Sequence, residues 1–379
     1  MKVAYVTVYD ARDVHSWSGT AYFMAESLRR SGLQVEPIGP LRQRFRGLLA
    51  LKAQAYRRLG NRLFVRDRTP VALSHYARQV ERALAEVEPD VVLTPNTVAL
   101  ARLRTEYPIV LWTDATFAGL VELPGRKLCR ESLRDGHRME REALSRCRLA
   151  LYASDWAAGS ARERYGVDPD KVKVVPFGAN LTRSPDREEV ETLVRNKGLG
   201  ACTLLFIGRD WAEKGGDVAL ETAALLNRRG LQTDLHVVGC KPPRGLPGFV
   251  RAHGFLSKAT EGGRARLTGL FRRAHFLILP TRVECFGIVL AEASAFGVPS
   301  LVSDVAGTSS AVTDGRNGKL FRVEQGAEDF AGYVQGLLAS EERYRALALS
   351  SYEEHAARLS WEAAGTRVRE LLSEACAAA

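Results

Sequence analysis

Short apolar runs alternate with longer amphipathic stretches along the whole chain. Runs such as Thr203–Gly208 and Phe276–Pro280 are apolar at almost every position and end at Gly or Pro, which is typical of strands buried in a parallel sheet. The stretches between such runs, for example Ser18–Ser31, repeat apolar residues at helical spacing and end before glycine. This alternation in both halves predicts an α/β fold with two doubly wound parallel-sheet domains.

One charged segment, 183–200, interrupts the alternation and holds few apolar residues, so we expect the hinge between the domains there. The predicted N-terminal domain is 1–183 and the predicted C-terminal domain is 196–355. Ligands of doubly wound sheets bind beyond the carboxyl ends of the strands, so two facing domains would share a cleft.

The strongest motif lies in Thr281–Ser294, between the strand at Phe276–Pro280 and a short apolar helix. It contains Glu284, then Phe286 and Gly287, then Glu292 eight positions after the first glutamate. Glycine lets the backbone approach a ligand closely, and a helix N-terminus is a ready anion site. The two carboxylates lie about two helical turns apart on one face. One can therefore reach the reactive end of a ligand while the other reaches hydroxyls further along it.

A second motif follows the strand at Thr203–Gly208. Arg209 and Lys214 flank a turn that ends in two glycines where a helix begins. Cations beside a helix N-terminus are suited to neutralising a diphosphate.

On these residues the chain resembles the retaining glycosyltransferases of the GT-B fold, family four. The resemblance implies two Rossmann-like domains, with the last helix, about 356–379, crossing back to complete the first. It places Glu284 near the donor sugar and Glu292 on the ribose hydroxyls, and it assigns the donor diphosphate to Arg209 and Lys214. The same resemblance gives the diphosphate and sugar to the backbone amides of Phe286, Gly287, Ile288 and Val289.

The resemblance extends to three less specific positions. The turn after the first strand holds Gly19, which the family places beside the donor phosphates, although Trp17 and Ser18 stand where the family usually has another glycine. The loop after Pro108–Thr116 holds Asp114 where the family often has a sugar-contacting histidine. His253 to Phe255 match the segment near which the family binds the nucleobase, largely through backbone groups. Loop packing or capping would explain Trp17, Asp114 and His253 equally.

These assignments predict transfer of a sugar from a nucleoside-diphosphate sugar, UDP- or GDP-linked, to a hydroxyl acceptor with retention of configuration. The donor is a substrate, and we expect no obligatory cofactor and no metal because no Asp-x-Asp pair lies in a plausible cleft loop. A sugar-nucleotide epimerase of the same fold is one alternative. A non-enzymatic binder of membranes or nucleic acid is another, but it leaves both motifs unexplained.

A net charge of +10 permits nucleic acid, an anionic membrane or phosphorylated ligands as partners. The basic residues concentrate in Arg42–Arg68, where nine Arg and Lys face one Asp and apolar residues recur at near-helical spacing. This segment could lie on a membrane or receive an anionic acceptor. The interpretation as a solvated helical insertion is favoured, and no nucleic-acid partner is expected.

Six scattered cysteines without metal-ligand spacing indicate a reducing cytoplasm. No apolar run approaches the ~18 residues of a spanning helix, and the first apolar run is better explained as a strand than as a signal peptide. We therefore expect a cytoplasmic protein. Arg42–Arg68 is the segment that could contact the inner face of the membrane.

Overall fold

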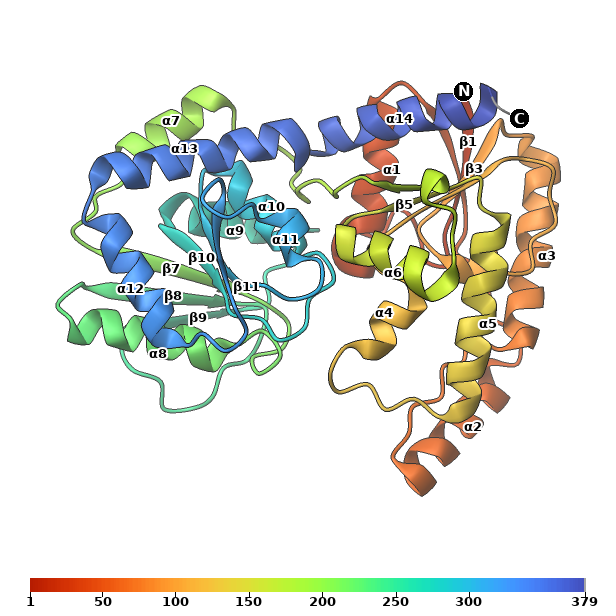
Figure 1. Ribbon diagram of the computed structural model, residues 1–379, viewed down its shortest axis with the longest axis horizontal. Helices are drawn as coiled ribbons and strands as arrows, with labels where there is room; N and C mark the ends of the chain where they lie inside the picture. The colour runs from red at the N-terminus through yellow and green to blue at the C-terminus, as the bar shows by residue number, and fades with distance from the viewer. Residues whose placement is uncertain (378–379) are drawn as a thin grey trace. The chain divides into compact units, whose positions relative to one another are not determined.

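A computed structural model describes residues 1–377, and contacts divide the chain into two compact units (Figure 1). The first unit holds Met1–Val175 together with the chain from Ala364 onward, and the second holds Pro176–Ala363. Each unit contains one six-stranded sheet in which every pairing is parallel. The predicted α/β fold with a parallel sheet in each half is therefore confirmed.

The first sheet has the order β2-β1-β3-β4-β5-β6. Its strands are β1 (Lys2–Val6), β2 (Gln34–Ile38), β3 (Val91–Thr94), β4 (Ile109–Thr113), β5 (Leu149–Tyr152) and β6 (Val172–Val174). The helices of this unit are α1 (Thr20–Arg30), α2 (Arg46–Gly60), α3 (Pro70–Val87), α4 (Phe117–Glu122), α5 (Arg130–Arg146), α6 (Asp155–Tyr165) and α14 (Trp361–Ala377), which starts at the end of the second unit.

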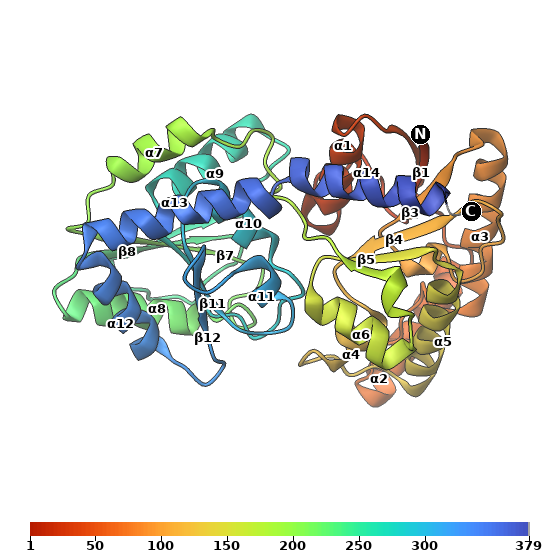
Figure 2. The same cartoon turned by 45° about the horizontal axis from the view of Figure 1, so that its top comes forward.

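The second sheet has the order β12-β11-β10-β7-β8-β9. Its strands are β7 (Cys202–Ile207), β8 (Thr233–Val238), β9 (Val250–Gly254), β10 (Phe276–Leu279), β11 (Ser300–Ser303) and β12 (Gly318–Phe321). Its helices are α7 (Arg187–Arg195), α8 (Gly216–Arg228), α9 (Glu261–Arg273), α10 (Ile288–Ala295), α11 (Thr308–Ala311), α12 (Ala327–Leu338) and α13 (Glu341–Arg358), and Figure 2 shows helices on both sides of each sheet.

The strand order of the second sheet reverses between β7 and β10. These two strands pair directly, with Phe276 opposite Leu204, although β8 and β9 separate them along the chain. Both strands are buried almost throughout, which explains their continuous apolar sequences. The loops that leave β7 and β10 therefore start side by side at the carboxyl edge of the sheet, where doubly wound folds bind ligands.

The segment 183–200, predicted to be the hinge, folds as part of the second unit. Asp186 caps α7 through a reciprocal capping box with Glu189. Val190 and Val194 are buried, and α7 packs against α13. Val190 and Val194 thus form the buried face of one helix. The chain changes unit at Val175–Pro176 and again at Ala363–Ala364.

The last helix returns to the first unit, where Gly365 packs closely against the backbone of Ser27 in α1. A Cβ at position 365 would lie 2.7 Å from the Ser27 carbonyl oxygen. Positions 378–379 of the predicted helix lie outside the described residues.

The α7 cap gives a direct test of this part of the fold. Replacing Asp186 with Ala removes an N-cap hydrogen bond, so we expect Asp186→Ala to lower the free energy of unfolding by about 1 kcal/mol. Urea denaturation measures this loss. Glu188→Ala is the matched control, because Glu188 lies two residues after Asp186 and outside the capping box. Equal losses of unfolding free energy in both variants would contradict the assignment of Asp186 as the cap.

Candidate active site

Two loops meet at the carboxyl edge of the second sheet. One joins β7 to α8 and carries Arg209 and Lys214, and the other joins β10 to α10 and carries Glu284 and Gly287. Gly215, with a φ of +73°, turns the first loop against the backbone of Pro280 in the second, where a Cβ would lie 1.9 Å from the carbonyl oxygen. Only glycine allows this approach, so the two loops form one surface.

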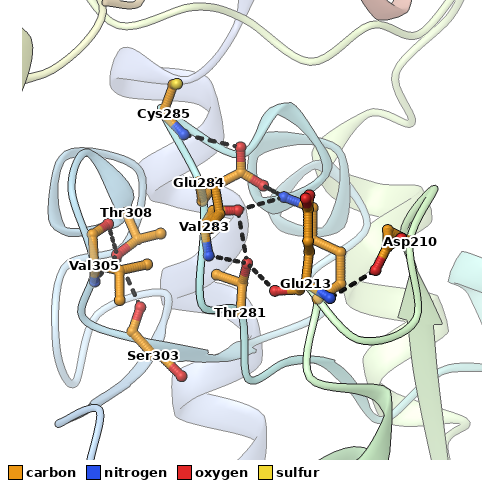
Figure 3. Close-up of polar contacts among 10 residues, drawn as sticks. Asp210, Glu213, Thr281, Val283, Glu284, Cys285, Ser303, Val305 and Thr308 are labelled. Carbon is orange, nitrogen blue, oxygen red and sulfur yellow. Dashed lines mark hydrogen bonds and ion pairs between the residues drawn. The ribbon is translucent and has the colours of Figure 1, made fainter. Parts of the chain in front are cut away.

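An ion pair joins the two motifs predicted from the sequence. The Lys214 Nζ donates to Glu284 Oε2 at 2.9 Å and to the carbonyl oxygen of Val283 at 2.6 Å. Both side chains are mostly buried, with 18% of each exposed. Figure 3 shows the Glu284 carboxylate facing this contact, with its second oxygen accepting from the Cys285 amide at 3.1 Å. The pair therefore carries little net charge and holds Glu284 in one orientation.

Further hydrogen bonds hold the loops in register. The Arg282 amide donates to the Glu213 carbonyl at 2.8 Å. The Thr281 hydroxyl donates to the same carbonyl at 3.3 Å (Figure 3). The Arg282 guanidinium also binds both carboxylate oxygens of Asp217, at 3.0 and 2.7 Å. This hydrogen bond from Arg282 lowers the pKa of the Asp217 carboxyl. Bidentate Arg–carboxylate contacts are geometrically specific, so the Arg282–Asp217 pair orients the turn before Glu284.

The N-terminus of α10 is open for an anion. Gly287, the N-cap residue, has a φ of +85° and supplies no side-chain cap to the first turn, which starts at Ile288 and Val289. Phe286 points elsewhere: it is buried and meets the ring of Phe177 edge-on at 5.6 Å between centroids. Its side chain is therefore part of the core, and only its backbone remains available for the predicted contact.

Glu292 is buried within α10, with 2% of its surface exposed. Its carboxylate pairs with Lys258, in the segment that follows β9, and accepts a hydrogen bond from the backbone of Asn180. Burial raises the pKa of Glu292, against the opposing charge of Lys258. Burying a carboxylate is unfavourable because it loses its water, and acids with such shifted pKa values are typical of functional sites.

Two neighbours of Glu292 were absent from the sequence predictions. Lys258 supplies its counter-charge, and Asn180 accepts a hydrogen bond from the Trp361 indole at 3.0 Å. Trp361 in turn stacks on Phe177. No local pattern marks these residues, because they come from three separate parts of the chain.

Arg209 lies exposed at the start of the first loop, and within residues 1–377 no carboxylate pairs with it. His253, by contrast, is engaged: its Nε2 lies 2.9 Å from the Nδ1 of His236 on β8, and the rings stack. Burial, then the neighbouring His253, lowers the pKa of His236 to about 4. His253 therefore joins two strands, whereas the Phe255 ring is 64% exposed.

Gly19 and Asp114 belong to the first unit. Gly19 has a φ of +90° and precedes α1, while Trp17 and Ser18 before it are also left-handed, with φ of 49° and 57°. Three such residues in succession make a strained turn, in place of the glycine pair typical of the family. Asp114 follows β4, and the cap of α4 is Thr116, so capping does not explain Asp114. Its charge adds to burial in raising the pKa of Tyr9.

Within residues 1–377, no group of three His, Cys, Asp or Glu side chains is placed to hold a metal ion.

Two doubly wound parallel-sheet units, one with two loops meeting at its carboxyl edge, define the class of α/β proteins that bind ligands at that edge. Residues 201–340 match the family model described as "Glycosyl transferases group 1", and residues 20–183 match "Glycosyltransferase Family 4". The chain therefore belongs to the group 1 and family-four glycosyltransferases.

The solved structures agree on the fold. A sucrose-phosphate synthase from Thermosynechococcus elongatus superposes over 100% of both chains with a TM-score of 0.71 at 16% identity. Anabaena HepE in complex with UDP covers 99% of this chain and 100% of its own, with a TM-score of 0.66 at 16% identity. The two parallel-sheet units are thus those of the GT-B fold.

Curated relatives match part of their length. A D-inositol 3-phosphate glycosyltransferase of Nocardia farcinica is 35% identical over 212 residues, 52% of this chain and 46% of that protein. One of Nocardiopsis dassonvillei is 32% identical over 253 residues, 61% of this chain and 58% of that protein. The chain thus spans about half the length of these relatives.

The environment of Glu292 predicts a pH-dependent stability. Because its pKa is raised above the ordinary 4.5 in the folded protein, the folded state holds the proton more tightly, and stability falls as pH rises from 4.5 through the folded pKa. Glu292→Gln lacks this loss. We therefore expect its melting temperature, relative to the wild type, to increase with pH across this window, as measured by calorimetry.

Lys258→Met should change the pH dependence of stability in the opposite direction to Glu292→Gln. Removing the counter-charge leaves the Glu292 carboxylate buried alone, so the decline with pH should be steeper than in the wild type. If the melting temperatures of Glu292→Gln and the wild type differ by the same amount at every pH, Glu292 is not buried in the charged form.

Proposed function

We propose that the protein is a retaining glycosyltransferase that moves a sugar from a nucleoside-diphosphate sugar to a hydroxyl acceptor. The observation that carries the proposal is the Lys214–Glu284 pair at the edge of the second sheet, between a glycine turn and the open N-terminus of α10. Cations and free amides there suit a diphosphate, and the buried Glu292 suits the hydroxyls of a ribose.

Arg209 and Lys214 would bind the diphosphate and stabilise the charge that develops on it as the bond to the sugar breaks. The amides at Gly287, Ile288 and Val289 would add donors to the same oxygens. Glu284 would contact the sugar through the face left open by Lys214.

Retention is proposed to occur on one face of the sugar. The acceptor oxygen would form its bond to the anomeric carbon as the bond to the diphosphate breaks, and the acceptor proton would pass to the departing phosphate oxygen. The ion pair with Lys214 supports this route, because a carboxylate held by an ammonium group and an amide is a weak nucleophile for a covalent intermediate.

A UDP-sugar is the first donor to test and a GDP-sugar the second. The structural neighbour HepE was solved with UDP and with UDP-glucose, which supports this order. The family resemblance places the base beside the segment from His253 to Phe255, and the structure links this segment through Lys258 to Glu292.

Cation chemistry at Arg209 and Lys214 also supports the proposal that transfer needs no metal. The acceptor is a hydroxyl compound, and inositol 3-phosphate enters the acceptor panel because the curated relatives carry it in their names.

A cytoplasmic location, with peripheral contact to the inner membrane face through Arg42–Arg68, is part of the proposal. All six cysteines are free thiols, which suits a reducing compartment. Among residues 1–377, no helix combines the length and the apolar composition needed to cross a bilayer.

Donor binding can be measured as thermal stabilisation by a panel of nucleoside diphosphates and nucleotide sugars. A ligand at ~100 times its dissociation constant stabilises the native state by about 2.7 kcal/mol. We expect one base to give this shift and Glu292→Ala to lose it. Arg209→Ala should weaken binding of the same nucleotide by roughly 1.5–3 kcal/mol, the contribution of a charged hydrogen bond.

Arg228→Ala is the matched control for Arg209→Ala, because Arg228 is an exposed arginine of the same unit at the far end of α8. If no nucleotide stabilises the wild type, or if Arg228→Ala weakens binding as much as Arg209→Ala, the assignment of the donor site is wrong.

Product analysis tests the reaction itself. With donor, a hydroxyl acceptor panel and excess EDTA, we expect proton NMR to show a product with the anomeric configuration of the donor, formed at the same rate as without EDTA. An inverted product would refute the one-face mechanism, and loss of turnover in EDTA would refute metal independence. Isomerisation of the donor sugar without acceptor would identify the epimerase instead.

A further inference from the structure

Helix α2 is attached to the first unit along one side only. None of its fifteen residues is buried. Tyr56 and Lys52 bind the carboxylate of Glu131 at the start of α5, at 3.0 and 2.6 Å, and Tyr56 stacks on Phe64. These contacts fix the orientation of the helix, so its other faces have defined directions. In Figure 1, α2 extends at the end of the first unit, beyond α5.

A solvent-exposed face of α2, next to the attached one, is apolar. At 3.6 residues per turn, positions 48, 51, 55 and 59 fall on one face of the helix. Leu48, Leu51 and Leu59 are 67%, 65% and 89% exposed, and Ala55 between them is exposed as well. Three solvent-exposed leucines in a row are costly unless another apolar surface covers them. We call this set the leucine stripe.

Cations border the leucine stripe. By helical spacing, Arg58 lies along one edge and Lys52 along the other. Arg62 follows the end of the helix, and the whole segment 42–68 holds nine basic residues and one aspartate. An apolar stripe between cationic edges is complementary to the apolar interior and anionic surface of a lipid bilayer. Nucleic acid would satisfy the cations but leave the leucines in water.

A pocket of about 780 Å³ adjoins the leucine stripe, between α2 and the segment that opens α5. Apolar atoms dominate its lining, chiefly from Tyr56, Leu59, Leu128 and Leu133, while Arg62 and Arg130 also line it. An apolar cavity with cationic side chains suits an amphiphile that has an apolar chain and an anionic head.

We infer that α2 docks on an anionic lipid bilayer through the leucine stripe, and that the adjoining pocket holds the apolar chain of one anionic lipid. This inference rests on the proposed membrane contact and deepens it by naming the surface and the ligand. The leucines enter the boundary between head groups and chains. Arg62 and Arg130 bind the head group of the lipid whose chain occupies the pocket.

Vesicle flotation tests the bilayer contact. The full chain should bind vesicles of phosphatidylglycerol and phosphatidylcholine but not of phosphatidylcholine alone. Leu48→Ser with Leu51→Ser, which leaves the pocket lining intact, should abolish this binding. Arg58→Ser with Arg62→Ser should weaken it about fivefold for each arginine, since a basic residue at an anionic surface contributes about 1 kcal/mol.

Arg138→Ser with Arg141→Ser is the matched control, because it removes the same charge from exposed positions of α5 in the same unit. If both double arginine variants weaken vesicle binding equally, the effect comes from net charge alone, and α2 is not the docking surface. Circular dichroism and the nucleotide-induced thermal shift confirm that each variant is folded.

A monomeric lipid tests the pocket separately. Below its micellar concentration, lysophosphatidylglycerol should bind the wild type more tightly than lysophosphatidylcholine, as measured by calorimetry. Leu133→Trp fills the pocket and should lose this binding at least tenfold, whereas the Leu48→Ser, Leu51→Ser variant should keep it. Arg130→Gln should remove the preference for the anionic lipid.

The outcomes separate the proposals. Vesicle binding without monomer binding overturns the pocket and leaves the bilayer contact. Failure of both, in a protein that still binds nucleotides, overturns the membrane contact and leaves the glycosyltransferase. Concentration-dependent dimers that the double-serine variant abolishes would show that a second copy covers the leucine stripe, which also overturns the inference.

Discussion

The close approach of two loops at the β7–β10 reversal is the constraint on which the candidate active site depends. Gly215 allows the first loop to lie against Pro280, and this contact brings Lys214 within 2.9 Å of Glu284. A side chain at position 215 would separate the loops and leave a carboxylate and an ammonium group only partly solvated. The bidentate contact between Arg282 and Asp217 then fixes the turn that carries Glu284. The chemistry of the site is thus built on backbone proximity.

A second network ties the buried Glu292 to the segments by which the chain enters and leaves the second unit. Asn180 follows the first crossing, Trp361 precedes the second, and the two are hydrogen bonded. Gly178 lies directly against the backbone of Trp361, where a Cβ would be 2.2 Å from the amide nitrogen. Phe177 packs between Trp361 and Phe286. Glu292 therefore contacts the first crossing through Asn180, and Asn180 joins it to the second through Trp361. The ring of Phe286 is held in the same network by Phe177.

The first unit combines a conventional core with one unconventional attachment. Trp112 is fully buried in β4 and its indole donates to the Val175 carbonyl at 3.0 Å, so the sheet has no unsatisfied polar group at that ring. Helix α2, in contrast, buries no residue and presents leucines to solvent. The leucine stripe and its cations are accordingly explained by an external partner.

Local apolar periodicity and glycine turns were sufficient to predict the repeated strands and helices, the parallel sheets and the two motifs around Lys214 and Glu284. The sequence pattern misplaced the hinge, since 183–200 has few apolar residues, and only packing against α13 reveals that Val190 and Val194 are enough for one helix. Only the folded chain shows that Lys258 and Asn180 hold Glu292, that His253 pairs with His236, and that the ring of Phe286 belongs to the core. These contacts join residues distant along the chain, and such contacts leave no periodic signal in the sequence.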